Sequence, residues 1–440
     1  MLSEVRIESL AYTGAGIAHQ DDGRVVFVSG GLPGDRALVE IQVDKTRYLR
    51  ARLVELLEAS ELRLDAACQH AGQCGGCPWQ CLAYPAQLEW KRRFVADALE
   101  RVGHIPDAEA LVAPIEASPK TWYYRNKVEF SVFGQAGRLH LGMHQSNDTE
   151  PTAISSCLLL PKVLADEPLS LGGTLNFALG REPVQPYRLG IRHSTRTKSC
   201  ELALWSTPCG MQRGFVAGLL AKAVPNSSTV RVLTRSNDAG RKVVNTEVLS
   251  GQGSWTEQLA GFRFMISAPS FFQVNTAVAE AMVAKLVELA APADKHIWDL
   301  YCGAGTFSLP LAAAGATVSA VELAGSSLRD LRRNLKNANL EKGVQVVSGD
   351  VAIALRSLAP ARLAVVDPPR SGLKPQVTAQ LVDSPTAELI YVSCDPQTLA
   401  RDAALLVAGG YHLQGVYPYD LMPQSYHVET IAYFVRGKTA

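Results

Sequence analysis

Acidic residues follow four apolar segments in the second half of the chain, at the intervals of an alternating strand-and-helix pattern. The segments contain "IWDL", "ATVSAVE", "VQVVSGD" and "LAVVDPP", and their acids are Asp299, Glu322, Asp350 and Asp367. Strands that alternate with helices form a parallel sheet with helices on both faces. Such sheets bind ligands just outside the carboxyl ends of their strands. The pattern therefore predicts a Rossmann-like α/β domain with a binding site at the four acids.

The turn after the first of these strands narrows the choice of ligand. It holds Gly303 and Gly305, but Ser308 stands where a dinucleotide-binding turn has its third glycine. The missing glycine argues against a pyrophosphate, and the acid of the first strand suits a cationic ligand without phosphates. S-adenosylmethionine meets both conditions. Glu322 is then placed to bind the ribose hydroxyl pair and Asp350 to reach the adenine.

The length of 440 residues is too great for one hydrophobic core and indicates several domains. We expect an OB-like β-barrel over residues 1–57 and a central mixed α/β domain over residues 58–84 and 119–259. A helical segment over residues 85–118 should pack on the catalytic α/β domain, which we expect over residues 260–440.

The first 57 residues alternate apolar and polar side chains between glycines, which is typical of short strands. A five-stranded barrel of the OB type fits their number. Its basic residues surround Tyr48 and are Lys45, Arg47, Arg50 and Arg52. Such a group either faces RNA phosphates with a stacking aromatic ring or is simply the solvated face of a strand.

Composition and charge limit the class of protein and the compartment in which we expect it. The net charge is +1 and 47% of the residues are hydrophobic, as in a soluble globular protein. The start of the chain has no signal-peptide pattern, and no apolar run is long enough to cross a bilayer. We therefore expect a cytoplasmic protein without membrane contact, and a monomer by default. In a reducing compartment the nine cysteines are ligands, nucleophiles or buried apolar residues, not disulfides.

Four of the cysteines lie in the segment "CQHAGQCGGCPWQC". Cys68, Cys74 and Cys77 have C-x5-C-x2-C spacing, and a fourth thiolate comes either from Cys81 or from the distant Cys157. A zinc site normally offers two paired ligand knuckles, whereas this loop holds one. A [4Fe–4S] cluster takes four thiolates and accepts three from one loop with one remote ligand. We favour the cluster with Cys157 as fourth ligand, and zinc is the alternative.

A ninth cysteine follows a buried strand in "LIYVSCDPQTLAR". Cys394 stands where the apolar run gives way to Asp395 and Pro396, at the edge where an open α/β sheet carries its chemistry. It is a candidate nucleophile, and the alternative is a buried structural cysteine.

The motifs together carry a family resemblance. "FFQVN", "DLYCGAGTFSL", "DPPRSG", "SCDPQTLARD" and "HVET" occur in this order, after the cysteine segment. This set resembles the RNA uracil-5 methyltransferases over essentially the whole chain, and the first 57 residues resemble a TRAM domain, an RNA-binding module. The full arrangement is similar to that of the members that modify 23S ribosomal RNA.

The resemblance implies roles for individual residues. Cys394 would be the nucleophile that adds to carbon 6 of uracil, and Glu429 the base that removes the proton from carbon 5 after methyl transfer. S-adenosylmethionine would be held by Gln273, Tyr301, Thr306, Glu322, Asp350 and Asp367. Cys68, Cys74, Cys77 and Cys157 would hold the [4Fe–4S] cluster. The target uridine would have to leave its stack to reach the thiol.

Other functions remain as alternatives. The same chemistry on tRNA is one, and a non-catalytic RNA-binding iron–sulfur protein is another. A cytosine-5 DNA methyltransferase uses a similar thiol, but its nucleophile follows a proline and lies early in its domain, whereas Cys394 follows Ser393 and lies late. An oxidoreductase would need a phosphate-binding loop for a flavin or nicotinamide, which the chain lacks. We therefore expect 23S ribosomal RNA, and no DNA, as partner.

Overall fold

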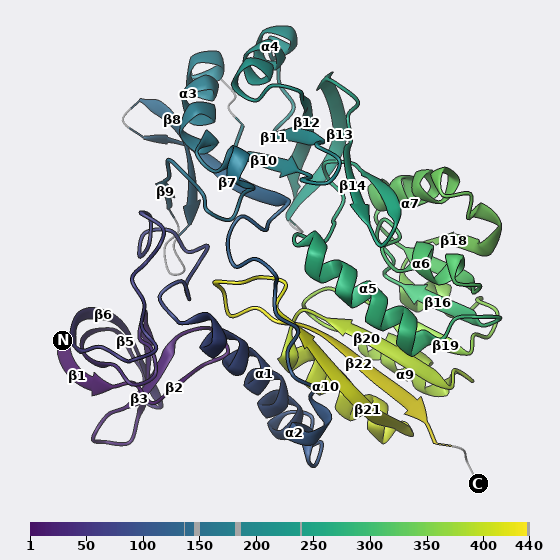
Figure 1. Cartoon of the computed structure of the whole chain (residues 1–440), viewed down its shortest axis with the longest axis horizontal. Coiled ribbons are helices and arrows are strands. Elements are labelled where there is room, and N and C mark those ends of the chain that lie inside the picture. Colours follow the sequence, from purple (N-terminus) through teal and green to yellow (C-terminus); the bar gives the residue numbers. More distant parts are fainter. Residues whose placement is uncertain (136, 145–149, 181–185, 238–239, 438–440) are drawn as a thin grey trace.

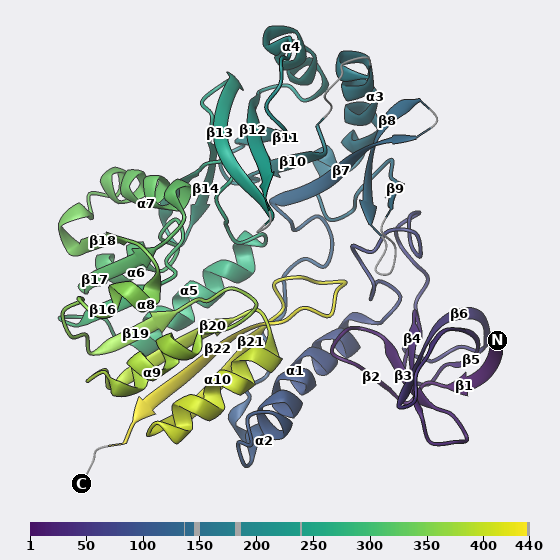
Figure 2. The same ribbon diagram turned by 180° about the vertical axis from the view of Figure 1, so that it is seen from behind.

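The computed structural model describes residues 1–135, 137–144, 150–180, 186–237 and 240–437. An N-terminal barrel, a central sheet domain and a C-terminal α/β domain surround the loop that joins the last two strands of the chain (Figure 1). The view from behind shows the same loop between the three parts (Figure 2). The expected domain ranges 119–259 and 260–440 include some residues outside this description.

The barrel has a sheet of six strands in the order β1-β5-β6-β4-β3-β2. Its first two strands belong to one extended segment, which pairs with β5 and then with β3. The change of partner occurs at Ile7 and Glu8, whose amides donate to Asp35 and Ile17. Because this segment reaches both edges of the sheet, it closes the barrel. The strands are β1 Leu2–Arg6, β2 Ser9–Leu10, β3 Gly16–His19, β4 Val25–Ser29, β5 Arg36–Asp44 and β6 Tyr48–Glu58.

A cysteine-rich loop connects the barrel to a long helix, α1 Tyr84–Arg101, which is followed by α2 Ala108–Leu111. Pro85 occupies the first turn of α1, where its missing amide hydrogen is not needed. The apolar face of α1 includes Val95 and Leu99 and packs in the same core as residues of the C-terminal domain.

The central domain is a seven-stranded mixed sheet in the order β13-β12-β11-β10-β7-β8-β9. Helices α3 and α4 cover one face, where Leu171, Leu175 and Leu220 join the sheet residues in one core. Its elements are β7 Lys127–Gln135, β8 Arg138–His144, β9 Pro151–Ala153, η1 Lys162–Leu164, α3 Glu167–Leu179, β10 Arg188–His193, β11 Cys200–Ser206, α4 Arg213–Ala223, β12 Ser227–Asn237 and β13 Gly240–Ser250.

A hairpin, β14 Trp255–Leu259 and β15 Phe262–Ile266, leads into the C-terminal domain. The sheet of that domain has the order β18-β17-β16-β19-β20-β22-β21. Its strands are parallel except β22, which lies antiparallel between β20 and β21. The strands are β16 His296–Leu300, β17 Thr317–Glu322, β18 Val344–Ser348, β19 Leu363–Val366, β20 Glu388–Ser393, β21 Tyr411–Tyr419 and β22 Glu429–Arg436.

Helices cover both faces of this sheet, as the alternating pattern predicts. One core joins α5, α6 and α7 to the sheet and the hairpin, and the other joins α1, α2, α8, α9 and α10 to the opposite face. The remaining elements are α5 Thr276–Ala290, α6 Ser308–Ala313, α7 Gly325–Asn337, η2 Glu341–Gly343, α8 Val351–Ala354, α9 Pro375–Asp383 and α10 Pro396–Ala408. None of the helices in the described ranges is both long and apolar enough to traverse a bilayer.

Candidate active site

Cys394 lies directly after β20, before the first turn of α10. Asp395 caps that helix by accepting hydrogen bonds from the amides of Gln397 at 2.9 Å and Thr398 at 3.0 Å. Burial and, after it, the charge of Glu429 raise the pKa of the Cys394 thiol to about 12. The thiol therefore carries its proton at neutral pH in the free protein.

Glu429 is the first residue of β22 and is 7% exposed. The antiparallel register pairs Ser393 with Thr430, so Cys394 and Glu429 follow at the adjacent positions of the two strands. Burial and, after it, the charge of Asp367 raise the pKa of Glu429 to about 8. A thiol and a carboxyl group with perturbed pKa values thus stand together at the carboxyl edge of the sheet, and such groups cluster at functional sites.

Arg370 supplies positive charge to this pair. It lowers the pKa of both Cys394 and Glu429 against the effect of burial. Its guanidinium also lies 3.5 Å from Nε2 of His427, whose pKa falls to about 4, first through burial and then through Arg370. We predicted no role for Arg370 from the sequence, although its place directly after the "DPP" of a strand end was a usable signal.

Three carboxyl groups, those of Asp299, Glu322 and Asp367, lie next to this pair around the glycine turn after β16. We call these three residues the acidic floor. Asp299 is fully buried and accepts a hydrogen bond of 2.5 Å from Ser308 through Oδ2. Its other oxygen, Oδ1, is buried and has no hydrogen-bond partner within the described part of the chain. Burial raises the pKa of Asp299 to about 7, and Glu322 adds to the shift. An unpaired buried carboxylate oxygen is what a cationic ligand would satisfy.

Glu322 and Asp367 complete this floor at the ends of β17 and β19. Burial and, after it, the charges of Asp299 and Glu322 raise the pKa of Asp367 to about 7, which indicates that the three carboxyl groups lie near one another. Glu322 also holds the turn, because it accepts hydrogen bonds from the amides of Gly303 at 2.9 Å, Leu323 at 2.8 Å and Ala324 at 2.6 Å.

The glycine turn itself requires unusual backbone conformations. Gly305 has a φ of +94°, and a Cβ there would lie 2.6 Å from side-chain carbons of Leu309 and Leu331. Tyr301 also adopts a positive φ of +66°, which is costly for an aromatic residue and is typical of functional sites. Thr306 lies in the same turn, partly buried.

Two further residues predicted to bind the cofactor are Gln273 and Asp350. Gln273 is buried just before α5, and its carbonyl accepts a hydrogen bond from Asn126 at 2.9 Å. Asp350 caps α8 by accepting from Ala352 and forms an ion pair of 2.7 Å with Lys374. The hydrogen bond from Lys374 holds the pKa of Asp350 below its usual value.

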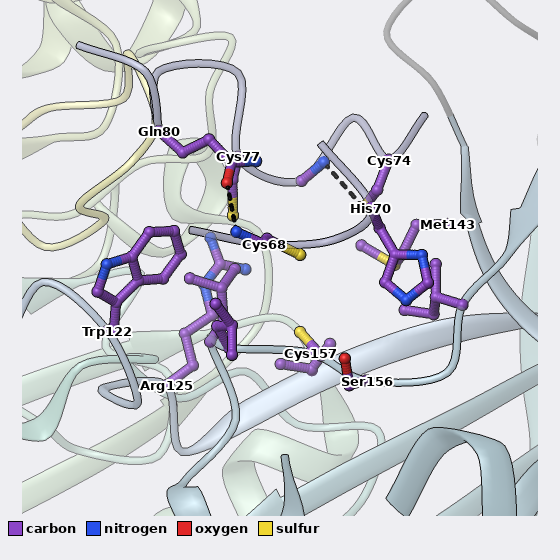
Figure 3. Close-up of a pocket in the computed structure, with 15 residues that line it drawn as sticks. Cys68, His70, Cys74, Cys77, Gln80, Trp122, Arg125, Met143, Ser156 and Cys157 are labelled. Carbon is purple, nitrogen blue, oxygen red and sulfur yellow. Dashed lines mark hydrogen bonds between the residues drawn. The ribbon is translucent and has the colours of Figure 1, made fainter. Parts of the chain in front are cut away.

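The four predicted cluster ligands line one cavity of about 40 Å³ (Figure 3). Cys68 and Cys157 approach it from opposite walls. Burial raises the pKa of Cys77, and the thiols of Cys157, Cys74 and Cys68 add to that shift, which places all four near one another. The alternative ligand lies elsewhere: Cys81 packs with the aromatic residues between barrel and α1.

Across the described residues, no three or more His, Cys, Asp or Glu side chains converge closely enough to hold one metal ion. The cluster and the zinc alternative therefore both stay predictions from the sequence.

Comparison with known proteins places the chain in a family. Residues 3–54 match the TRAM domain model, and residues 218–436 match the tRNA (uracil-5-)-methyltransferase model. An uncharacterized RNA methyltransferase of Thermosynechococcus vestitus is 34% identical, over 98% of this chain and 97% of the relative. The 23S rRNA (uracil(1939)-C(5))-methyltransferase RlmD of Shewanella halifaxensis is 31% identical, over 98% and 95%.

A solved structure agrees with the fold. The tRNA (uracil-54, C5)-methyltransferase of Pyrococcus abyssi, crystallised with S-adenosyl-L-homocysteine, superposes with a TM-score of 0.77. The match covers 98% of this chain and 99% of that protein at 22% identity, so it speaks for the fold. The two family models and the full-length relatives at more than 30% identity show that the chain belongs to the family of RNA uracil-5 methyltransferases.

Proposed function

We propose that this RNA uracil-5 methyltransferase transfers the methyl group of S-adenosylmethionine to carbon 5 of a uridine in 23S ribosomal RNA. The observation that carries the reaction is the placement of Cys394 beside Glu429, at the sheet edge that also holds the acidic turn. The substrate is supported by the full-length similarity to RlmD, a 23S rRNA enzyme.

Cys394 is the nucleophile of this proposal. Carbon 5 of uracil is a weak nucleophile, but addition of a thiolate at carbon 6 converts the ring to an enolate whose carbon 5 is electron-rich. S-adenosylmethionine, when bound, supplies the electrophilic methyl group. Cys394 thus forms the bond to carbon 6 before the methyl group arrives and must leave at the end.

Glu429 is the base that allows Cys394 to leave carbon 6 of the uracil. After methyl transfer, carbon 5 carries both the methyl group and a proton, and the ring regains its double bond only when that proton is removed. Glu429, as a carboxylate, takes the proton, the electron pair of the C–H bond forms the C5–C6 double bond, and the bond from carbon 6 to Cys394 breaks with its electrons on sulfur.

Asp299, Glu322 and Asp367 fit the cofactor through their charge. S-adenosylmethionine carries a sulfonium and an ammonium group, and the unpaired Oδ1 of Asp299 faces a region shared by three carboxyl groups. A ligand cation there would lower the pKa values that burial has raised. We expect Gln273, Tyr301 and Thr306 to border it.

Cys68, Cys74, Cys77 and Cys157 are proposed to hold a [4Fe–4S] cluster. A [4Fe–4S] cluster takes four thiolates, and these four cysteines would supply them. The observation that supports this proposal is that all four line one cavity. In this proposal the cluster shapes the protein and takes no part in methyl transfer.

Cysteine replacement tests that assignment. Cys157→Ser should lose most of the iron of the purified protein, whereas Cys81→Ser, the matched control outside the cavity, should keep it. Iron content per chain and the visible absorbance of the cluster measure both. Equal iron in wild type and Cys157→Ser, or loss only in Cys81→Ser, would contradict the ligand set.

Arg125 lines two cavities, the cysteine cavity and a polar cavity of about 220 Å³. The polar cavity is also lined by Lys120, Tyr123, His193 and Arg196. Cations beside an aromatic ring suit a nucleotide of a single strand. We propose that RNA lies across this cavity, with the target uridine turned out toward Cys394.

The pH dependence follows from Glu429. Its raised pKa means that the carboxylate form becomes more populated as pH increases through about 8. Since Glu429 must be ionised for the step that follows methyl transfer, we expect kcat, and not kcat/KM, to be about tenfold higher at pH 9 than at pH 7. Cofactor affinity measured at each pH separates this effect from loss of binding, and a flat profile would contradict it.

The substrate is tested with methyl-labelled S-adenosylmethionine and two RNAs, unmethylated 23S ribosomal RNA and unmodified tRNA. We expect 5-methyluridine in the ribosomal RNA, mapped to its position by mass spectrometry of fragments. Label in tRNA instead would keep the chemistry and overturn the substrate. No label in either RNA, with cofactor bound, would favour a non-catalytic RNA-binding protein.

A further inference from the structure

The barrel sends a side chain, that of Tyr12, to the active site. Tyr12 lies in the tight turn between β2 and β3, where the amide of Ala11 donates to Ala15 and that of Gly14 donates to Ala11. Its hydroxyl donates to Oδ2 of Asp395 at 3.3 Å, across 383 residues of sequence. Asp395 is the residue directly after Cys394.

Both oxygens of Asp395 are therefore in use. Oδ1 accepts the two amide hydrogens that cap α10, and Oδ2 faces Tyr12. The hydroxyl of Ser393 donates to the carbonyl of Asp395 at 3.0 Å and accepts from its amide at 3.1 Å. The turn that carries the thiol is thus held from its own helix and from the barrel.

An aromatic cluster fixes Tyr12 in place. Its ring packs edge-on against Phe94 of α1 at 5.7 Å and against Tyr426 at 6.3 Å. Trp79 contacts both of those rings and donates to the carbonyl of Gly14 at 3.2 Å. Gly14 has a φ of +84°, and a Cβ there would lie 2.5 Å from Tyr426. The barrel therefore meets the loop before Glu429 at a distance that only glycine allows.

We infer that Tyr12 is a positioning residue for the nucleophile, because it holds Asp395 next to Cys394. The barrel thus forms part of the catalytic site, in addition to any contact that it makes with RNA. This inference rests on the proposed role of Cys394. A hydrogen bond to a carboxylate weakens that carboxylate's repulsion of a neighbouring thiolate.

The charges that face Cys394 come from several elements. Glu429 on β22, Asp367 after β19 and Asp395 itself oppose formation of the thiolate, and Arg370 favours it. Tyr12 is the group that the barrel adds to this set.

Tyr12→Phe tests the inference, because it keeps the ring and its packing and removes the hydroxyl. We expect single-turnover methyl transfer to slow about 3- to 10-fold with RNA affinity unchanged. In the full chain without RNA, we also measure how the rate of Cys394 alkylation by iodoacetamide depends on pH. This alkylation profile should shift to higher pH in Tyr12→Phe. Iodoacetamide adducts are assigned to Cys394 by peptide mass spectrometry.

Tyr433→Phe is the matched control. Tyr433 also donates to a carboxylate, Glu388, at 3.1 Å, but at the opposite end of β20 from Cys394. It should leave the alkylation profile as in wild type. In an Asp395→Asn background, Tyr12→Phe should have little further effect on alkylation, because the charge it acts on is gone.

The outcomes separate this inference from the proposed function. An unchanged alkylation profile in Tyr12→Phe would overturn the inference, whether or not RNA binding weakens. A shifted profile together with a wild type that methylates no RNA would support the positioning role and overturn the function.

Discussion

Replacing Cys394 with alanine should lower the rate of methyl transfer by on the order of 10⁴-fold or more, while the cofactor still binds. The reason is chemical, because without a thiolate at carbon 6 the uracil ring has no electron-rich carbon 5. Alanine at this partly buried position removes only the sulfur and leaves β20 and the cap of α10 intact. Transfer of labelled methyl to RNA and calorimetric binding of S-adenosyl-L-homocysteine measure the two properties.

Cys302→Ala provides a matched control. Cys302 is buried next to the glycine turn, and nothing in the proposed chemistry uses its thiol. It should keep methyl transfer within about tenfold of wild type, the loss reflecting packing in a nearby core. Substantial methylation by Cys394→Ala would show that the nucleophile is a different residue or that the ring is activated in another way.

Glu429→Gln should stop the reaction after methyl transfer. Glutamine cannot take the proton from carbon 5, so the bond between Cys394 and carbon 6 cannot break. We expect turnover to fall by about 10²- to 10⁴-fold, with a methylated protein–RNA adduct that survives denaturing electrophoresis. The change is nearly isosteric, and burial already keeps Glu429 largely protonated at neutral pH, so the fold should tolerate it.

The adduct separates the role of base from other roles. It should carry one labelled methyl group per RNA, and it should be absent from the double variant with Cys394→Ala. If Glu429→Gln were inactive without an adduct, Glu429 would act before methyl transfer, for example by placing the uracil. If it turned over normally, another group would be the base.

The raised pKa values bear on both variants. Cys394 and Glu429 both hold protons in the free protein at neutral pH, and the charge of Glu429 disfavours ionisation of Cys394. In the proposed reaction, Arg370 and the bound ligands would shift this balance toward the thiolate and the carboxylate.

Local sequence determined the binding edge of the C-terminal domain. Apolar runs of strand length, separated by helical segments, placed Asp299, Glu322 and Asp367 at strand ends, and the structure has them there around one turn. This worked because burial and strand pairing act on neighbouring residues, so their signature lies within a short window. The order of motifs was also enough for the family, which the full-length relatives show.

Tertiary structure decided which distant residues meet. The sequence shows that "HVET" follows "SCDP", but only the insertion of β22 antiparallel between β20 and β21 puts Glu429 beside Cys394. Packing also brought Cys157, and not Cys81, to the cysteine cavity. The sequence left both thiols open because ligand spacing does not encode the direction of a side chain.

Tyr12 had no signal in the sequence at all. A tyrosine in a barrel turn is ordinary, and its importance arises from a contact with Asp395 that is 383 residues away. Periodicity and turn chemistry describe forces within an element, whereas the docking of one domain on another depends on the shapes of both surfaces. The sequence by itself therefore determined the family of this protein and its candidate catalytic residues, and the tertiary structure decided how the barrel and those residues share one site.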